Sequence, residues 1–294
     1  GYGGQTDRQG TSFESLSWAS ALLAATDEIV AFSTIHVPLI HPVFAAKSMV
    51  TADHVGQGRF GINIVSGWNI EEFAMFGIPM REHDERYVYS AEWVKVLKKI
   101  YSETEPFDFE GKYFNLKNVA AKPKPWDPGL PMLMSAGSSK AGRSFAINNV
   151  DCLFMVITEE AKIESDVAAV KAVPGADQCG LFASGHLLCR RTPKETEEYY
   201  HYLVREKGDW EAAEQIIAKR AAGGSQSMSP DILRKAKERV IAGGATFPVI
   251  SPYTEEVIAH VPDGGTLAVV WLGPVGQFAA RVGRHLGYDV IGID

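Results

Sequence analysis

The chain has 294 residues, of which 46% are hydrophobic and 22% are charged, and its formal net charge is −7. A chain of this size can bury one large core or two ordinary domains. The negative charge and the lack of a long basic run exclude nucleic acid and anionic membranes as expected partners. The sequence has no apolar stretch of roughly 18 residues or more, so we expect no membrane-spanning helix.

The cysteines indicate the cellular compartment of the protein, and the start of the chain indicates whether it begins within a larger domain. Cys152, Cys179 and Cys189 are odd in number and lack the spacing of a metal site. We therefore expect a reducing, cytoplasmic location. The chain opens on Gly1 in a glycine-rich segment typical of a loop, and we expect no signal peptide before it. We expect it to begin in the middle of a larger fold.

Predicted helices and strands alternate through the first half of the chain. Helices are predicted from caps and helical spacing, and strands from short apolar runs. In order, they are a helix to residue 25 capped by Thr11 or Ser12, a strand over residues 29–34, a helix over 42–55 opened by Pro42, a buried strand over 60–65, a polar loop, an amphipathic helix over 84–102 and a hairpin over 107–116.

The alternation continues to the end of the chain. It comprises a strand over residues 131–136, a helix over 139–149, a strand over 152–156, a helix over 159–173, a strand over 180–189, a helix over 193–207, a late strand over 266–271 and a helix over 274–286. Such alternation predicts a parallel sheet with crossover helices. A closed (β/α)8 barrel needs eight strands, so we expect the first ones to precede Gly1. An open doubly wound sheet is the alternative.

Chemistry in a parallel barrel lies where the strands end, so polar residues there are the candidates. His36 follows the first strand and can donate a hydrogen bond to a substrate or an oxygen species, although a structural histidine is equally consistent. Asn63 interrupts an apolar strand, and a buried amide must find partners. The ends of the next loops carry Arg86 and Tyr87, where the guanidinium can clamp a phosphate or simply lie on the surface.

A second anion site is indicated at residues 135–142, where a run of small residues opens a helix. Ser139 adds a hydroxyl donor and Lys140 adds a positive charge. The same residues are equally typical of an ordinary serine helix cap that binds no anion. His186 lies within the strand over residues 180–189 and is either a core histidine or a group at the barrel mouth. The sequence contains no Walker loop, HExxH, GxSxG or paired CxxC motif, which disfavours nucleotide hydrolysis, zinc proteolysis and serine hydrolysis.

Four motifs occur in the order found in one enzyme family. They are Thr34-Ile-His-Val-Pro-Leu-Ile-His-Pro42, Gly58-Arg-Phe-Gly-Ile-Asn-Ile-Val-Ser-Gly-Trp68, Glu85-Arg-Tyr87 and Ser135-Ala-Gly-Ser-Ser139. With them the chain resembles the luciferase-like flavin monooxygenases, in particular the branch of alkanesulfonate monooxygenase, dimethyl-sulfone monooxygenase and pyrimidine oxygenase. The resemblance implies an α/β (β/α)8 TIM barrel of the bacterial-luciferase type, here lacking its first strands. It also implies that the cofactor is reduced FMN, supplied by a separate flavin reductase. The other reactants it implies are O2 and a small organic substrate, and the protein is expected to form a homo-oligomer.

Residue roles follow from the same resemblance. It implies that Asn63 and Glu72 contact the flavin, and that Arg86, Tyr87 and Ser139 hold it, with Arg86 and Ser139 nearest the phosphate. It places His36 and His186 in the pocket for oxygen and substrate. It implies no metal ion in the site. In the sulfonate enzymes an arginine precedes the second histidine by two residues. Ser184 stands there in this chain, which argues against a sulfonate substrate.

The C-terminal part departs from the family. We expect residues 1–262 to form the barrel, with a mobile lid near residues 223–228. Residues 263–294 resemble the first β-α-β of a zinc-type alcohol dehydrogenase, with Asp294 placed for a ribose, or else supply the last barrel strand and helix. A nicotinamide-dependent oxidoreductase is therefore one alternative function. A deazaflavin enzyme of the same barrel and an inactive fragment of a flavin monooxygenase are the others.

Overall fold

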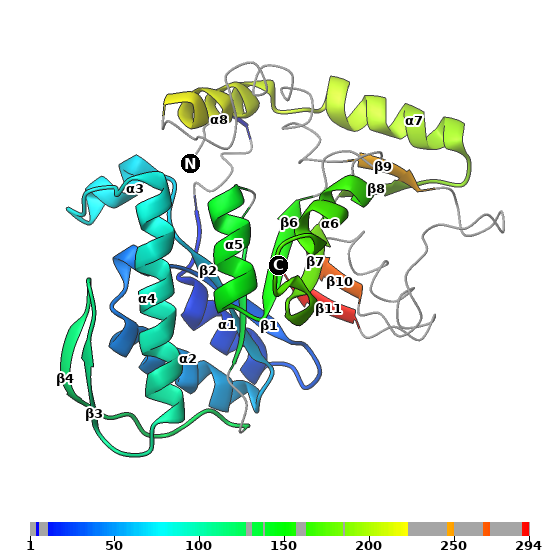
Figure 1. Cartoon of the computed structure of the whole chain (residues 1–294). Helices are drawn as coiled ribbons and strands as arrows, with labels where there is room; N and C mark the ends of the chain where they lie inside the picture. The colour runs from blue at the N-terminus through cyan, green and yellow to red at the C-terminus, as the bar shows by residue number, and fades with distance from the viewer. Residues whose placement is uncertain are drawn as a thin grey trace.

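Five parallel strands form the main sheet, in the order β1-β2-β5-β6-β7. The computed structural model describes residues 4–5, 11–127, 131–137, 139–156, 163–184, 186–222, 246–249, 267–270 and 290–293. The strands are β1 (Ala31–His36), β2 (Phe60–Val65), β5 (Met132–Ser135), β6 (Cys152–Val156) and β7 (Gly180–Ser184). Neighbouring strands all run parallel, so the five carboxyl ends lie at one edge of the sheet (Figure 1).

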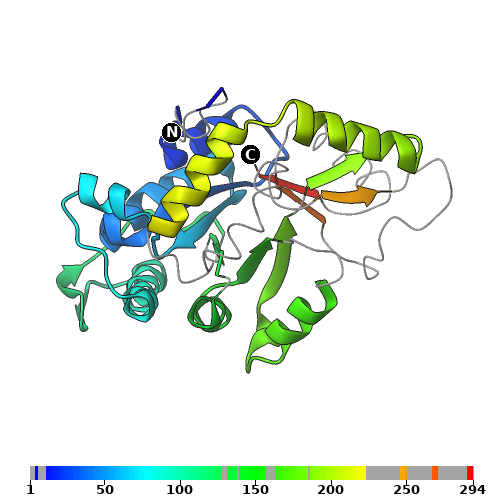
Figure 2. The same cartoon turned by 90° about the horizontal axis from the view of Figure 1, so that it is seen from above.

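One helix precedes the first strand of this sheet and the others connect its consecutive strands, as the predicted alternation requires. They are α1 (Ser15–Ala24), α2 (Pro42–Gly56), α4 (His83–Ser102), α5 (Lys140–Asn149) and α6 (Ile163–Lys171). Figure 2 shows them ranged along the outer side of the sheet. Within the described part of the chain, no helix combines the length and the apolarity that crossing a membrane requires.

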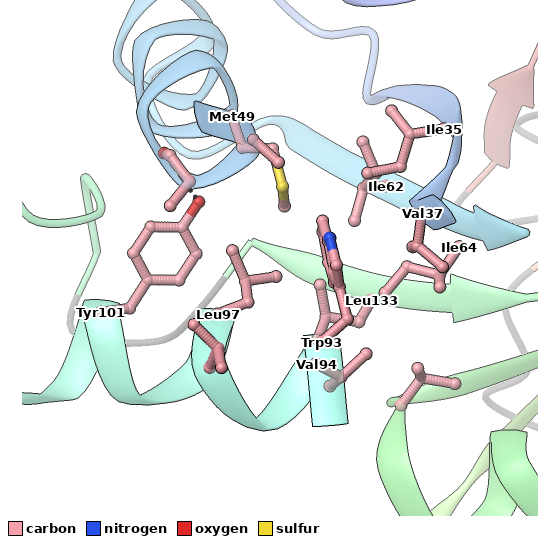
Figure 3. Close-up of a cluster of buried hydrophobic side chains, with 14 of the residues drawn as sticks. Ile35, Val37, Met49, Ile62, Ile64, Trp93, Val94, Leu97, Tyr101 and Leu133 are labelled. Atoms are coloured by element: carbon pink, nitrogen blue, oxygen red, sulfur yellow. Dashed lines mark hydrogen bonds between the residues drawn. The ribbon is translucent and has the colours of Figure 1, made fainter. Parts of the chain in front are cut away.

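The main core lies between the sheet and helices α2 and α4 (Figure 3). The strands contribute the fully buried side chains of Ile35, Ile62, Ile64 and Leu133. Two large side chains of α4 fill the space opposite and have their polar atoms paired. The indole of Trp93 donates to the carbonyl oxygen of Ile40 at 2.9 Å, and the hydroxyl of Tyr101 donates to that of Ala46 at 3.0 Å. These hydrogen bonds tie the middle of α4 to the segment before α2 and its C-terminal end to α2.

Side chains along the strands alternate between this core and the opposite, inner face of the sheet. Ser33 and Ile35 of β1 are buried on the helix side. Thr34 and His36 consequently lie on the inner face. The same alternation in β2 places Asn63 there, directly opposite Thr34 in the strand register.

An antiparallel hairpin extends from α4 as predicted. It consists of β3 (Phe107–Glu110) and β4 (Asn115–Val119). The carboxylate of Glu92 on α4 holds the turn, because it accepts hydrogen bonds from the backbone N–H groups of Lys112 at 2.9 Å and of Tyr113 and Phe114 at 2.8 Å. A Cβ on Gly111 would lie 2.2 Å from Glu92 Oε1, so a larger residue there would have to displace the carboxylate that holds the turn.

Predictions for the first two elements were wrong in their boundaries. Helix α1 is capped by Glu14, not by Thr11 or Ser12, because the Glu14 carboxylate accepts the N–H groups of Leu16 and Ser17. Strand β1 starts two residues later than the predicted 29–34. The carbonyl of Ile29 is bound by the Arg59 guanidinium at 2.8 Å, which keeps Ile29 in the loop before the strand.

The polar loop expected after β2 contains a short helix, α3 (Ile70–Met75). The side chain of Asn69 caps it by accepting the N–H groups of Glu71 and Glu72, at 3.1 and 3.4 Å. This helix stands next to the carboxyl ends of the strands and brings an acidic side chain to them.

The strand predicted for residues 180–189 is two strands in different sheets. β7 ends in the main sheet, whereas β8 (His186–Cys189) pairs in parallel with β9 (Thr246–Val249), which the sequence did not indicate. A single strand cannot pair with both β6 and β9, and the described part of the chain assigns residues up to Ser184 to β7 and residues from His186 to β8. Helix α7 (Pro193–His201) and a π-helical turn to Glu206 confirm the helix predicted next, and α8 (Trp210–Ala222) follows.

The late strand predicted for residues 266–271 is confirmed as β10 (Leu267–Val270). It pairs in parallel with β11 (Val290–Ile293). β10 lies beside β7 and β11 lies beside β1, which are the two edge strands of the main sheet. The predicted helix over residues 274–286 and the predicted lid over residues 223–228 lie outside the described residues.

Candidate functional site

Polar side chains gather on the inner face where β1 and β2 end. The amide nitrogen Nδ2 of Asn63 donates to Thr34 Oγ1 at 3.2 Å. The other amide atom, Oδ1, is buried and has no hydrogen-bond partner within the described part of the chain. Such atoms are rare in proteins unless a ligand or water satisfies them. Sequence reasoning did not single out Thr34, although its position two residues before His36 places it on the same face.

His36, the last residue of β1, forms an ion-pair contact with α3. Its Nδ1 lies 2.8 Å from Oε2 of Glu72, and the two side chains are 21% and 31% exposed. Both residues were predicted at the site, but as separate contributors to substrate and flavin binding. The structure brings them into direct contact, and α3, which was not predicted, is the reason.

Arg86, in the first turns of α4, reaches the loop that follows β2. Its Nη1 donates to the carbonyl oxygen of Gly67 in a short hydrogen bond. Gly67 has a φ of +92°, and a Cβ there would lie 2.3 Å from the ring of Phe73, so only glycine allows this turn. The Nε of Arg86 is buried and unpartnered among the described residues. Trp68, the next residue of the loop, is 39% exposed.

Tyr87 joins α4 to the start of α5. A Cβ on Gly142 would lie 2.8 Å from the Tyr87 hydroxyl oxygen and 2.9 Å from the Cα of Gly137. Ser139 caps α5, because its Oγ accepts the N–H of Gly142 at 3.1 Å. A hydroxyl that accepts there still has its own hydrogen to donate. Tyr87 and Ser139 therefore both lie next to Gly142.

These contacts connect most of the predicted site residues. Asn63 and Gly67 belong to one strand and its exit loop, Arg86 binds that loop, and the next residue, Tyr87, contacts the turn that Ser139 caps. They therefore occupy one edge of the sheet. His186 is the exception. It begins β8, outside the main sheet, and its side chain lies outside the described part of the structure.

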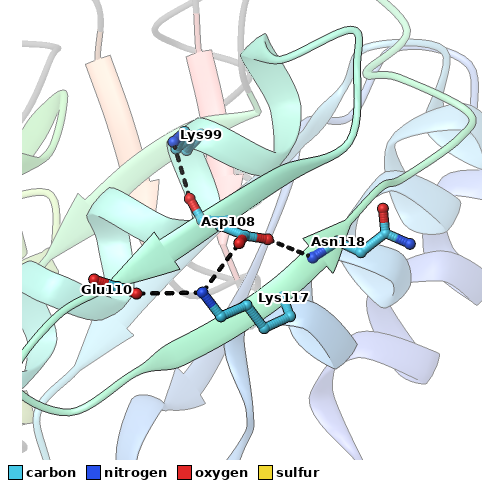
Figure 4. Close-up of polar contacts among 5 residues, drawn as sticks. All are labelled: Lys99, Asp108, Glu110, Lys117 and Asn118. Atoms are coloured by element: carbon cyan, nitrogen blue, oxygen red, sulfur yellow. Dashed lines mark hydrogen bonds and ion pairs between the residues drawn. The ribbon is translucent and has the colours of Figure 1, made fainter.

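Two other polar features lie away from the strand ends. On the hairpin, Lys117 bridges Asp108 at 3.0 Å and Glu110 at 3.2 Å, while the N–H of Asn118 and the ammonium of Lys99 donate to Asp108 (Figure 4). The groups of this cluster satisfy one another, which is typical of a structural surface network. A surface hollow of about 490 Å³ between α4, the hairpin and the end of α5 contains none of the predicted site residues.

A family model for luciferase-like monooxygenases matches residues 2–260. The chain therefore belongs to the luciferase-like monooxygenase family, as the motifs predicted. It is 32% identical over 201 residues to an FMNH2-dependent dimethylsulfone monooxygenase of Pseudomonas putida, covering 68% of this chain and 55% of the relative. It is also 32% identical over 202 residues to a pyrimidine monooxygenase of Caulobacter sp. (strain K31), covering 67% and 56%. The chain thus spans about half the length of the curated relatives it matches.

Solved structures agree with the fold. A riboflavin lyase superposes with a TM-score of 0.72 at 22% identity, over 96% of this chain and 69% of that one. A long-chain alkane monooxygenase gives 0.70 at 19% identity, over 97% and 69%. At these identities the likeness concerns the fold alone. The predicted luciferase-type α/β fold is confirmed at that level.

Proposed function

We propose that the protein is a monooxygenase that uses reduced FMN and O2 to oxygenate a small organic molecule. The observation that carries this proposal is the placement of these side chains at the carboxyl edge of the sheet: Arg86 binds the loop that follows the strand of Asn63, and Tyr87 lies beside Gly142, whose N–H Ser139 accepts. Ligands of parallel α/β folds bind at this edge. Family membership supports the same assignment.

Two buried polar atoms fit a flavin. Within the described part of the chain, Asn63 Oδ1 is an acceptor without a partner and Arg86 Nε is a donor without one. An isoalloxazine ring offers both N–H and carbonyl groups along its polar edge, and a ribityl phosphate offers acceptor oxygens. A ligand of this chemistry would satisfy atoms that are costly to leave unpaired.

Each residue then has a distinct task. Asn63 and Glu72 would contact the ring, and Arg86, Tyr87 and Ser139 would hold the ribityl phosphate against the start of α5, where free N–H groups favour an anion. His36 and His186 would line the substrate pocket. The bound flavin supplies the activation of O2. The residues of the chain bind it, orient it and exclude water from it.

The relatives support the nature of the substrate and partners. Two of them are named for dimethylsulfone and for pyrimidines, so we propose a small, polar organic substrate, with an organosulfur compound as one candidate. We further propose a separate flavin reductase as the source of reduced FMN, a homo-oligomer and a cytoplasmic location. The buried free thiols of Cys152 and Cys179 favour a reducing compartment.

We also propose that the C-terminal tail belongs to the barrel. β10 lies beside β7 and β11 beside β1, so this parallel pair stands between the two edges of the main sheet. A closed ring would remove both exposed edges, which are otherwise prone to aggregation. This arrangement favours a TIM-type barrel over a separate nicotinamide-binding unit.

Anaerobic titration of the chain with reduced FMN, followed by flavin fluorescence, tests the proposal. We expect saturable binding to the chain, weakened tenfold or more by Asn63→Ala and by Arg86→Ala. The latter loses a charged donor, which is worth about 1.5–3 kcal/mol. Lys117→Ala on the hairpin is the matched control and should bind like the unaltered chain.

Three outcomes would contradict the proposal. One is a lack of saturable binding, including in a chain extended with the first strands. Another is equal affinity in all variants. The third is a clear preference for a deazaflavin or for NAD(H) over FMN in parallel titrations, which would favour one of the alternative cofactors.

A further inference from the structure

Two buried serines join the exit loop of β2 to helix α4. Ser66 directly follows the last residue of β2, and Ser90 belongs to α4. Their hydroxyl oxygens lie 2.8 Å apart, and Ser90 Oγ also donates to the carbonyl oxygen of Arg86 at 2.9 Å. The guanidinium of Arg86 binds the carbonyl of Gly67, which is the residue after Ser66. The backbone and the side chain of Arg86 are thus tied to two consecutive residues of one loop.

The direction of each hydrogen bond in this serine pair follows from what the groups can donate. A carbonyl oxygen only accepts, so Ser90 gives its single hydroxyl hydrogen to Arg86. Ser90 must then accept the hydrogen of Ser66. Both serines are buried, so bulk water does not compete for these bonds. The bonds therefore run in one direction, from the loop through the serine pair to the backbone of α4.

We propose that Ser66 and Ser90 are positioning residues for Arg86, and that they hold its guanidinium where it favours a flavin that carries a phosphate. This inference rests on the proposed function, since Arg86 is the residue that would hold the phosphate of FMN. The serine pair itself would not touch the flavin. It fixes the loop against α4, and with it the position of the Gly67 carbonyl that the guanidinium binds.

The guanidinium of Arg86 retains unused capacity to bind an anion. Its Nε is buried without a hydrogen-bond partner among the described residues, and no carboxylate among them forms an ion pair with Arg86. A buried donor and an uncompensated charge are costly unless a ligand satisfies them. A phosphate matches the charge and the planar fork of the guanidinium. Because a free arginine side chain samples many rotamers, holding it in one orientation favours that contact.

Paired titrations with reduced FMN and reduced riboflavin test the proposal, because the two flavins differ only in the phosphate. We expect the unaltered chain to bind FMN more tightly, and Arg86→Ala to remove this preference. Ser66→Ala and Ser90→Ala should each raise the dissociation constant of FMN about three- to tenfold, as the loss of one buried hydrogen bond predicts, and leave that of riboflavin unchanged. Adding Ser90→Ala to Arg86→Ala should weaken FMN binding no further, since both act through one guanidinium.

Ser20→Ala is the matched control for Ser90→Ala. In α1, Ser20 Oγ donates at 2.9 Å to the carbonyl oxygen of Leu16, four residues earlier, which is the same bond that Ser90 makes in α4. We expect this control to leave the ratio of FMN to riboflavin affinity unchanged, whatever its effect on the melting temperature. A serine pair that serves only the fold predicts the same for Ser66→Ala and Ser90→Ala. An unchanged ratio in both variants would therefore overturn the proposal.

NMR of the Arg86 Nε–H group gives a second measurement, in the chain without flavin. Since Nε is buried, we expect an ordered N–H that exchanges slowly with water. Ser66→Ala and Ser90→Ala should increase its motion and its exchange, whereas Ser20→Ala should not. Unchanged order in both serine-pair variants would contradict a positioning role.

Failure of the proposed function would look different from failure of this inference. An unaltered chain that binds neither flavin would contradict the proposed function, and the Nε–H signal would still decide whether the serine pair positions Arg86. Equal affinity of the unaltered chain for FMN and riboflavin would overturn the preference for a phosphate. Loss of that preference in Arg86→Ala alone, with both serine-pair variants unaffected, would leave the proposed function standing and overturn the inference.

Discussion

Gly137 and Gly142 touch through their backbones where β5 meets α5: a Cβ on Gly137 would lie 2.6 Å from the carbonyl carbon of Gly142. Because both positions are glycine, the backbone at the end of the strand lies directly against the backbone of the first turn of the helix. The helix start that Ser139 caps is thereby brought to the edge of the sheet.

Substituting Gly137 should therefore disturb both stability and ligand binding. Because the clash is with backbone, Gly137→Ala must push α5 away, and we expect a loss of about 1–3 kcal/mol in unfolding free energy together with weaker FMN binding. Urea unfolding and flavin titration measure the two effects. Gly180→Ala is the control and should cost less, since the nearest atom to its Cβ would be the Cys152 sulfur, at 3.1 Å, and the others would lie at ordinary contact distance. Equal losses in the two variants would argue against a special role for the Gly137 contact.

Asn63 should be a residue that the fold does not need. Its buried Oδ1 has no partner among the described residues, and its bond from Nδ2 to Thr34 is exposed, so Asn63→Leu should leave the melting temperature unchanged or raise it, while FMN binding is lost. For Ser135 we expect the opposite effect on stability. Its hydroxyl donates to the carbonyl of Ile64 at 3.0 Å within the core, and Ser135→Ala should cost about 0.5–1.5 kcal/mol. A marked destabilisation by Asn63→Leu would show that the amide serves the fold.

The Glu92 carboxylate should anchor the hairpin without affecting the site. Glu92→Ala leaves three backbone N–H groups of the turn without their acceptor, and we expect a loss of about 1–3 kcal/mol. Hydrogen exchange should increase at residues 112–114, with FMN affinity retained. Glu110→Ala, which removes only an exposed contact with Lys117, should change little. Unchanged exchange in Glu92→Ala would contradict the anchoring role.

Cys152 should resist alkylation in the folded protein. Burial raises the pKa of its thiol from 9.0 to about 12, and burial also raises the pKa of Cys179. The protonated thiol of Cys152 thus contributes stability that is complete below pH 9 and is lost as the pH rises from 9 to about 12. We expect iodoacetamide at pH 8.5 to modify both residues only after unfolding, as peptide mass spectrometry can show. Rapid modification of Cys152 in the folded chain would contradict its buried position.

The order of elements could be predicted because each helix and strand of the main sheet carries its own local pattern. Pro42 and Ser139 mark helix starts by chemistry that acts over a few residues, and the structure confirms both. Strand β1 was placed two residues early because its start depends on Arg59, thirty residues along the chain, which holds the Ile29 carbonyl. Such a tertiary contact leaves no local signal.

The sequence indicated which residues belong to the candidate site, but it did not indicate which of them contact one another. Asn69 followed by Glu71 and Glu72 is a cap signal that could have indicated α3. Nothing in the sequence, however, says that Glu72 would meet His36, since that depends on how α3 sits at the end of the sheet. The separation of β8 from β7 is likewise set by a distant segment, β9.

Helix α4 connects the proposed phosphate site to a distant contact with α2. Arg86 and Tyr87 occupy one end, while Tyr101 is tied to α2 through the Ala46 carbonyl at the other. Residues 86–101 span about 22 Å at 1.5 Å per residue. A tilt of about 3° around the tied end would shift Arg86 by about 1 Å, a displacement that can cost an enzyme about 100-fold in rate. Substitutions at the contact between Tyr101 and α2 would therefore change the position of Arg86 and the affinity for a phosphate, without altering any residue that contacts the phosphate.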